Sequence, residues 1–129
     1  VESDGRMSIT TGYSSQLNIG SGVYFNDGAV ISCLGKIDIG ENTLFGPGVK
    51  IFDNNHRFSR EEGVSRECTA GCITVGRSCW IASDVVLLKG TDIGDNCVIG
   101  AGCVIRGAVP AGSLVTRSGE QTTRPIETR

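Results

Sequence analysis

The sequence contains few aromatic residues, few prolines and only one histidine. Phe, Trp and Tyr make up 5% of the 129 residues, and 3 prolines stand against 19 glycines. Gly-rich chains that stay disordered lack aliphatic residues, whereas 39% of this chain is hydrophobic. Glycine is therefore expected to mark the turns of a regular fold. The length suits one domain, so we expect residues 1–129 to form a single domain.

The chain also lacks a strong charge of either sign and any long apolar run. The net charge is −2 and there is no basic run, which argues against nucleic acid as a partner. No apolar run approaches the roughly 20 residues of a membrane span, so no membrane partner is expected. Because the chain does not begin with Met, we expect that a short N-terminal piece precedes Val1.

A six-residue repeat runs from Ile73 to Arg106. One aliphatic residue recurs at every sixth position: Val75, Ile81, Leu87, Ile93, Ile99 and Ile105. A smaller residue follows each of them four positions later: Cys79, Val85, Thr91, Cys97, Cys103 and Val109. A helix would repeat apolar residues at three and four, and a single strand at two. The spacing instead predicts a parallel β-helix with six residues per face and eighteen per coil.

Earlier coil starts are marked by aliphatic-x-aliphatic-Gly at residues 17, 37 and 73, and a weaker copy begins at 91. The spacings are 20, 36 and 18, so the first coil carries about two extra residues near Leu34-Gly35-Lys36. The second is about one coil too long, which predicts an inserted loop over about 53–72. Residues 1–16 read as a faint first coil with Met7 and Tyr13 in phase. The polar tail 116–129 is expected to be mobile or to lie along a neighbouring subunit.

The six cysteines do not read as a disulfide scaffold. Cys79, Cys97 and Cys103 occupy the small inward position of the repeat, which is a packing role. Cys68 and Cys72 lie close together in the insertion, but no second pair accompanies them as a metal site would require. Reduced thiols are therefore expected, and they suit a cytoplasmic protein.

The repeat resembles that of the hexapeptide-repeat acyltransferases, whose motif is aliphatic-Gly-x-x-small-x. The resemblance covers roughly residues 17–115. It implies an all-β, left-handed parallel β-helix in the form of a triangular prism with one long inserted loop. It further implies an acetyl-CoA-dependent O-acetyltransferase that needs no metal and acts on a hydroxyl of a sugar, polysaccharide or similar acceptor. The working unit is expected to be a homotrimer with coenzyme A in the grooves between subunits.

The candidate catalytic base is His56, the only histidine, at the start of the insertion. Ile51–His56 matches the aliphatic-x-Asp-x-x-His of the family, in which this His takes the proton of the acceptor. By composition alone, a loop His is commonly just solvated. Asp53 and Asn55 could orient the base or bind the acceptor, but Asp-Asn-Asn is also a turn sequence. Asn26, expected on the coil beneath His56, is an acceptor candidate or simply a turn residue.

The candidate acyl-donor residues follow from the same resemblance: Trp80, Ala82, Ser83, Gly100, Ala101 and Arg106. Trp80 is the sole Trp and is expected to point outward near the donor. Small residues at Gly100 and Ala101 let a ligand approach the backbone. The family has a lysine just after this position, and this chain lacks it. Arg106 is expected to supply the positive charge that faces the nucleotide phosphates.

Two other functions compete with acyl transfer. A γ-class carbonic anhydrase has this fold but needs three His ligands for zinc, and this chain has one His. A non-catalytic β-helix serving as an assembly or scaffold subunit would also suit the solenoid, and coenzyme A binding separates it from the acetyltransferase.

Overall fold

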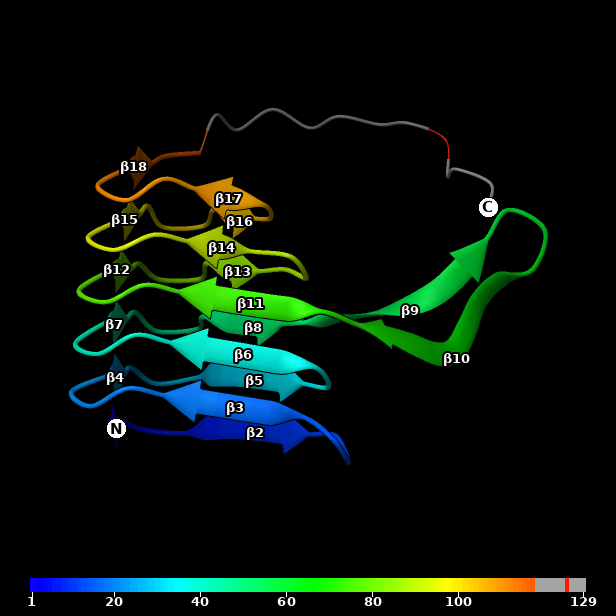
Figure 1. The fold of residues 1–129 in the computed structure, drawn as a ribbon, viewed down its shortest axis with the longest axis horizontal. Helices are drawn as coiled ribbons and strands as arrows, with labels where there is room; N and C mark the ends of the chain where they lie inside the picture. The colour runs from blue at the N-terminus through cyan, green and yellow to red at the C-terminus, as the bar shows by residue number, and fades with distance from the viewer. Residues whose placement is uncertain (118–124, 126–129) are drawn as a thin grey trace.

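The chain forms a triangular prism whose three faces are parallel β-sheets (Figure 1). The computed structural model describes residues 1–117 and Pro125. The expectation for the polar tail therefore lies mostly outside the described residues. Within the described part of the chain, no helix is long and apolar enough to cross a membrane.

We call the three sheets faces A, B and C, and all strand pairs within them are parallel. Face A contains β1 (Glu2–Ser3), β4 (Tyr24–Phe25), β7 (Leu44–Phe45), β12 (Trp80–Ile81), β15 (Val98–Ile99) and β18 (Leu114–Val115). Face B contains β2 (Met7–Thr11), β5 (Ala29–Cys33), β8 (Lys50–Phe52), β13 (Val86–Leu87) and β16 (Val104–Ile105). Face C contains β3 (Gln16–Ile19), β6 (Lys36–Ile39), β11 (Cys72–Val75), β14 (Asp92–Ile93) and β17 (Ala108–Val109).

The chain visits faces A, B and C in turn, so each coil contributes one strand to each face. In Figure 1 the strands of face C lie nearest the viewer and run to the left, those of face B lie behind and run to the right, and the chain climbs from the N-terminus upward. This winding is left-handed, opposite to the usual parallel crossover. The predicted all-β, parallel β-helix is confirmed.

Inward side chains at equivalent positions of successive coils stack into columns. Ile81 pairs in register with Phe45 below and Ile99 above, and all three are buried. The rings of Phe25 and Phe45 stack with centroids 4.5 Å apart and an interplanar angle of 7°. The aliphatic hexad positions and the small cysteine positions therefore form the core, as the repeat predicts.

Two register expectations are wrong. Val109 pairs with Ile93, which is an aliphatic position rather than the small one. The corner between β16 and β17 is shorter than the corner between β13 and β14 in the coil below. Gly107, at φ +76°, therefore takes the position that Thr91 has in that coil. Tyr13 is fully exposed, because the corner between β2 and β3 carries it outside the prism.

Glycine allows adjacent coils to approach each other at the corners. A Cβ on Gly40 would lie 2.5 Å from the backbone nitrogen of Arg77 in the next coil. Any side chain there would force the coils apart, which explains the Gly after Ile39 in the repeat.

The insertion leaves the corner between faces B and C as a β-hairpin rather than as an irregular loop. Strand β9 (Asn54–Ser59) pairs antiparallel with β10 (Gly63–Ala70), and the register shifts between Val64 and Cys68. The hairpin does not interrupt the solenoid, because β8 and β11 pair with strands of both the preceding and the following coil. The hairpin is thus an appendage that leaves the core intact.

Candidate functional site

Asp53 fixes the point where the hairpin leaves the prism. Its side chain is buried, and its two carboxylate oxygens accept hydrogen bonds from the backbone N–H groups of Leu34 and Gly35, each at 2.8 Å. These donors belong to the enlarged corner of the coil below. The carboxylate is therefore engaged with the backbone, and in this structure Asp53 acts on the position of the hairpin rather than on the imidazole of His56.

The two strands of the hairpin are also held at their base. The amide of Asn54 donates to the carbonyl of Ser32 at 3.2 Å and to its hydroxyl at 3.1 Å. The N–H of Gly71 donates to the carbonyl of Asp53 at 2.8 Å, which closes the hairpin. Gly35 has no Cβ to strike the carbonyl of Gly71, so the enlarged corner can lie directly under this closure.

His56 lies on β9 opposite Cys68 and is exposed. Its Nδ1 is 3.0 Å from the carbonyl oxygen of Ser65 on the partner strand. A carbonyl oxygen only accepts, so Nδ1 must carry the proton of this hydrogen bond. In the neutral ring Nε2 then keeps a free lone pair, which is the form of imidazole that can remove a proton from a hydroxyl. The Sγ of Cys68 lies 3.7 Å from the same Nδ1.

Lys89 joins the coil above to the hairpin. Its Nζ donates to the hydroxyl of Thr69 at 2.9 Å. Its stem passes over Gly71, where a Cβ would lie 2.9 Å from the Lys89 Cγ. Thr69 is the cross-strand partner of Asn55, the neighbour of His56. The hairpin is thus held by Asp53 from the coil below and by Lys89 from the coil above.

An open hollow of about 600 Å³ lies between the hairpin and Lys89. His56 and Asn55 line it together with Phe58, and charged side chains of both signs surround them. A hollow of this size suits a small organic ligand. His56 therefore borders a space that could hold a small ligand.

Most of the donor candidates gather at the corner between faces A and B. Asn26, Gly46, Ala82 and Gly100 occupy equivalent positions of successive coils there, because each N–H bonds to the coil above in the same way. Ser83 and Ala101 follow two of them. Asn26 thus lies one coil below the hairpin but at the other edge of face B, where its Oδ1 accepts from the N–H of Asp27 at 2.9 Å.

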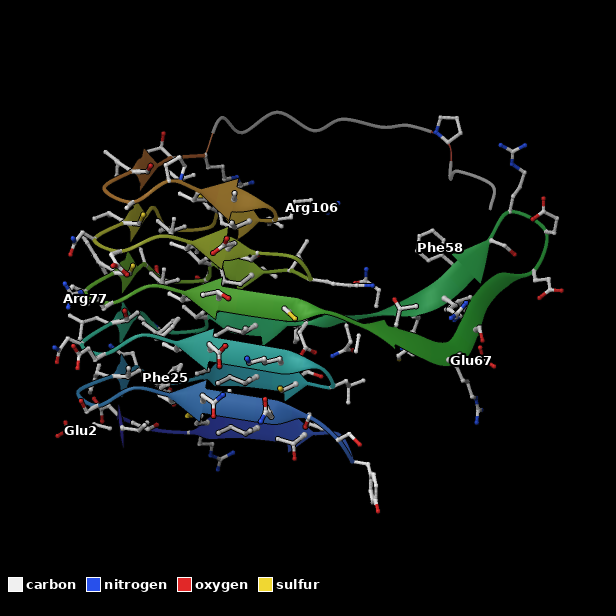
Figure 2. All side chains as sticks on the ribbon, in the orientation of Figure 1. Glu2, Phe25, Phe58, Glu67, Arg77 and Arg106 are labelled. Carbon is white, nitrogen blue, oxygen red and sulfur yellow. The ribbon has the colours of Figure 1, made fainter. Side chains whose placement is uncertain are left out.

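Trp80 and Arg106 lie on opposite sides of this corner. Trp80 points outward from face A with 55% of its surface exposed, between Leu44 and Val98. Arg106 follows β16, at the corner from which the hairpin leaves, and Figure 2 shows it on the hairpin side of the prism. Arg106 and the hairpin that carries His56 thus lie at the same corner of the prism, two coils apart, and the width of face B separates this corner from the one beside Trp80.

Two buried cysteines, Cys33 and Cys79, have thiols with a raised pKa. Burial raises the pKa of the Cys33 thiol, and the nearby charge of Asp53 raises it further. Burial also raises the pKa of the Cys79 thiol, whose Sγ donates to the carbonyl of Gly94 at 3.2 Å. Both thiols therefore stay protonated near neutral pH. Within the described residues, no three His, Cys, Asp or Glu side chains come together in a group that could hold a metal ion.

Known proteins share this architecture and repeat. A family model described as bacterial transferase hexapeptide (six repeats) matches residues 72–107. The galactoside O-acetyltransferase of Escherichia coli (strain K12) is 36% identical over 98 residues, which cover 76% of this chain and 48% of that enzyme. The chain belongs to the hexapeptide-repeat acyltransferase family. It spans about half the length of the E. coli relative.

Two solved structures are similar to this chain in fold. A maltose O-acetyltransferase from Clostridium difficile 630 aligns with a TM-score of 0.78 at 25% identity, covering 98% of this chain and 66% of that chain. A hexapeptide-repeat acetyltransferase from Vibrio cholerae O1 biovar eltor, solved with acetyl coenzyme A, aligns with a TM-score of 0.76 at 22% identity, covering 98% and 71%. The second likeness concerns the fold alone.

Sequence reasoning missed the hydrogen bond from Lys89 to Thr69 and the one from His56 to the Ser65 carbonyl. Lys89 lies eighteen residues, or one coil, after Gly71, so the period could have placed it above the hairpin base. No pattern in the sequence indicates the contact of the Ser65 carbonyl with His56, because the position of that carbonyl depends on the register shift within β10.

We predict that Lys89→Met lowers kcat for acyl transfer three- to tenfold. The methionine keeps an apolar stem over Gly71 and removes the bond to Thr69, worth about 1 kcal/mol. Thr69→Val should have the same effect, and the double variant should be no worse than either single one, because both remove one bond. Steady-state kinetics would measure this, with Lys36→Met on face C as the unaffected control. Additive losses in the double variant would contradict the tether.

Proposed function

We propose that this chain transfers an acetyl group from acetyl-CoA to a hydroxyl of a saccharide acceptor, with His56 as the general base. The observation that carries the proposal is the hydrogen bond from Nδ1 of His56 to the Ser65 carbonyl. It fixes the tautomer in which Nε2 can accept a proton. The anchors at Asp53 and Lys89 hold this imidazole beside an open hollow.

The proposed reaction uses this geometry in four steps. Nε2 of His56 takes the proton of the acceptor hydroxyl as its oxygen bonds to the thioester carbonyl carbon. Backbone N–H groups stabilise the negative charge that develops on the carbonyl oxygen. The carbon–sulfur bond then breaks, and the coenzyme A sulfur takes the proton from the imidazolium. The products are the acetyl ester and free coenzyme A, and no covalent acyl-enzyme is required because the thioester is already activated.

The donor is assigned to the corner between faces A and B. Ala82, Gly100 and Ala101 present no bulky side chain there, so an extended ligand can lie against the backbone. The exposed ring of Trp80 borders this corner. Similar proteins support both substrates, since they include a galactoside O-acetyltransferase, a maltose O-acetyltransferase and an acetyltransferase solved with acetyl coenzyme A.

We further propose that the working unit is a homotrimer with sites shared between copies. Facing outward in register on face A are Tyr24, Leu44, Trp80, Val98 and Leu114. Face B carries Val30, Lys50, Val86 and Val104, whereas face C carries Asn18, Asp38, Thr74 and Asp92. The outward row of face A is apolar, and that of face B is apolar apart from Lys50, so these two adjacent faces are suited to contacts between copies, and the polar third face is suited to water. Cyclic closure would bring the hairpin of one copy to the donor corner of the next.

His56→Ala is expected to lower the rate of acetyl transfer by about 10²–10⁴, the usual contribution of a general base. The side chain is exposed, so the melting temperature should not change. Release of free thiol from acetyl-CoA in the presence of a glycoside acceptor measures the rate. Arg66→Ala, at an exposed position of β10 outside the lining of the hollow, is the matched control and should retain activity. Equal turnover by His56→Ala and the parent enzyme would exclude His56 as the base.

Leu44→Lys should dissociate the trimer, because it places a charge in the middle of the apolar outward row of face A. Thr74→Lys, at an exposed position between Asp38 and Asp92 on face C, is the matched control and should leave the assembly intact. Light scattering would report three times the 13.5 kDa of the chain for the parent and the control. A monomeric and fully active parent would rule out shared sites. A trimer that binds no coenzyme A would favour the scaffold alternative.

A further inference from the structure

Phe58 and Val64 form an exposed apolar pair on the hairpin. They are cross-strand partners, and 54% and 74% of their surfaces are exposed. Residues two apart on a strand share a face, so Phe58 lies on the same side of β9 as His56. Both belong to the lining of the hollow, and neither is part of the hydrophobic core. Figure 2 shows the ring of Phe58 on β9, away from the coils that contain the core. The fold itself gives this aromatic ring no packing role.

The remaining lining of the hollow is polar and balanced in charge. Arg57 and Lys89 contribute two positive groups, and Glu62 and Glu67 contribute two negative ones. Arg57 lies near Glu67, with Nε 3.7 Å from the carboxylate, and alternation along β9 places this pair on the side of the strand opposite Phe58. An apolar wall in a hollow whose lining carries no net charge complements a molecule that has one apolar face and a rim of hydroxyls. An anionic acceptor would find no excess of positive charge here.

We propose that Phe58 and Val64 are the apolar wall of the acceptor site and that they select neutral pyranosides. The C–H face of the sugar ring packs against Phe58, and one ring hydroxyl then reaches Nε2 of His56. Phe58 is thereby a specificity-determining residue, which acts on the acceptor and not on acetyl-CoA. This inference rests on the proposed acetyl transfer and goes beyond it by naming the wall and the charge class of the acceptor.

The test compares Phe58→Ala with the parent enzyme on a neutral methyl glycoside and on the matching uronide. The parent should prefer the neutral glycoside. Phe58→Ala should raise KM for it about tenfold, which corresponds to about 1.4 kcal/mol and is on the scale of a stacked aromatic contact. KM for acetyl-CoA and the melting temperature should not change. Phe58→Tyr keeps the ring and should restore a near-normal KM for the glycoside.

Tyr13→Ala is the matched control, because Tyr13 is an exposed aromatic residue outside the hairpin and should not affect KM for the acceptor. Unchanged kinetics of Phe58→Ala in an enzyme whose parent acetylates the glycoside would overturn the inference and leave the proposed function standing. A change in assembly mass on Phe58→Ala would show that the wall packs on a second copy instead, which also overturns it. A parent that acetylates neither glycoside nor uronide while binding coenzyme A would overturn the proposed function itself.

Discussion

The structure depends on the in-register stacking of inward side chains from one coil to the next. Each coil buries its aliphatic residues only against its neighbours, as with the stacked rings of Phe25 and Phe45. Stacking at strand spacing requires the corners to approach equally closely, and at Gly40 only the absence of a Cβ permits this. The six-residue spacing of aliphatic and small residues is the sequence form of that constraint. The outer surface, which takes no part in the stacking, is free to carry function.

The hairpin shows how the solenoid accommodates a long insertion. It leaves at a corner, and the strands on either side keep their partners in both neighbouring coils. A buried carboxylate would normally be costly, but Asp53 receives two backbone N–H bonds that the enlarged corner below presents. The two extra residues of one coil and the insertion of the next are therefore joined in one structural unit. It supports the strand on which His56 presents Nε2.

The repeat was sufficient to predict the prism, because its period follows directly from the stacking. It was insufficient where the period changes, so Val109 was placed in the wrong column of the core. The candidate base could be found from a motif, but its tautomer depends on the Ser65 carbonyl, which lies across a register shift in β10. The role of Asp53 in holding the corner depends on tertiary contacts that the turn sequence Asp-Asn-Asn does not reveal. Local patterns cannot specify contacts made between coils at irregular corners.

The central claim is that His56 of one copy acts with the donor corner of another, and activity of mixed trimers tests it most directly. His56→Ala removes the base, and Ala101→Trp, at an exposed corner position, blocks the donor. Each variant alone should be inactive. Trimers assembled at random from equal amounts should recover about a quarter of the parental activity, because one interface in four then joins an intact base to an intact corner. If mass spectrometry shows mixed trimers and activity stays at the level of the single variants, the shared site is contradicted.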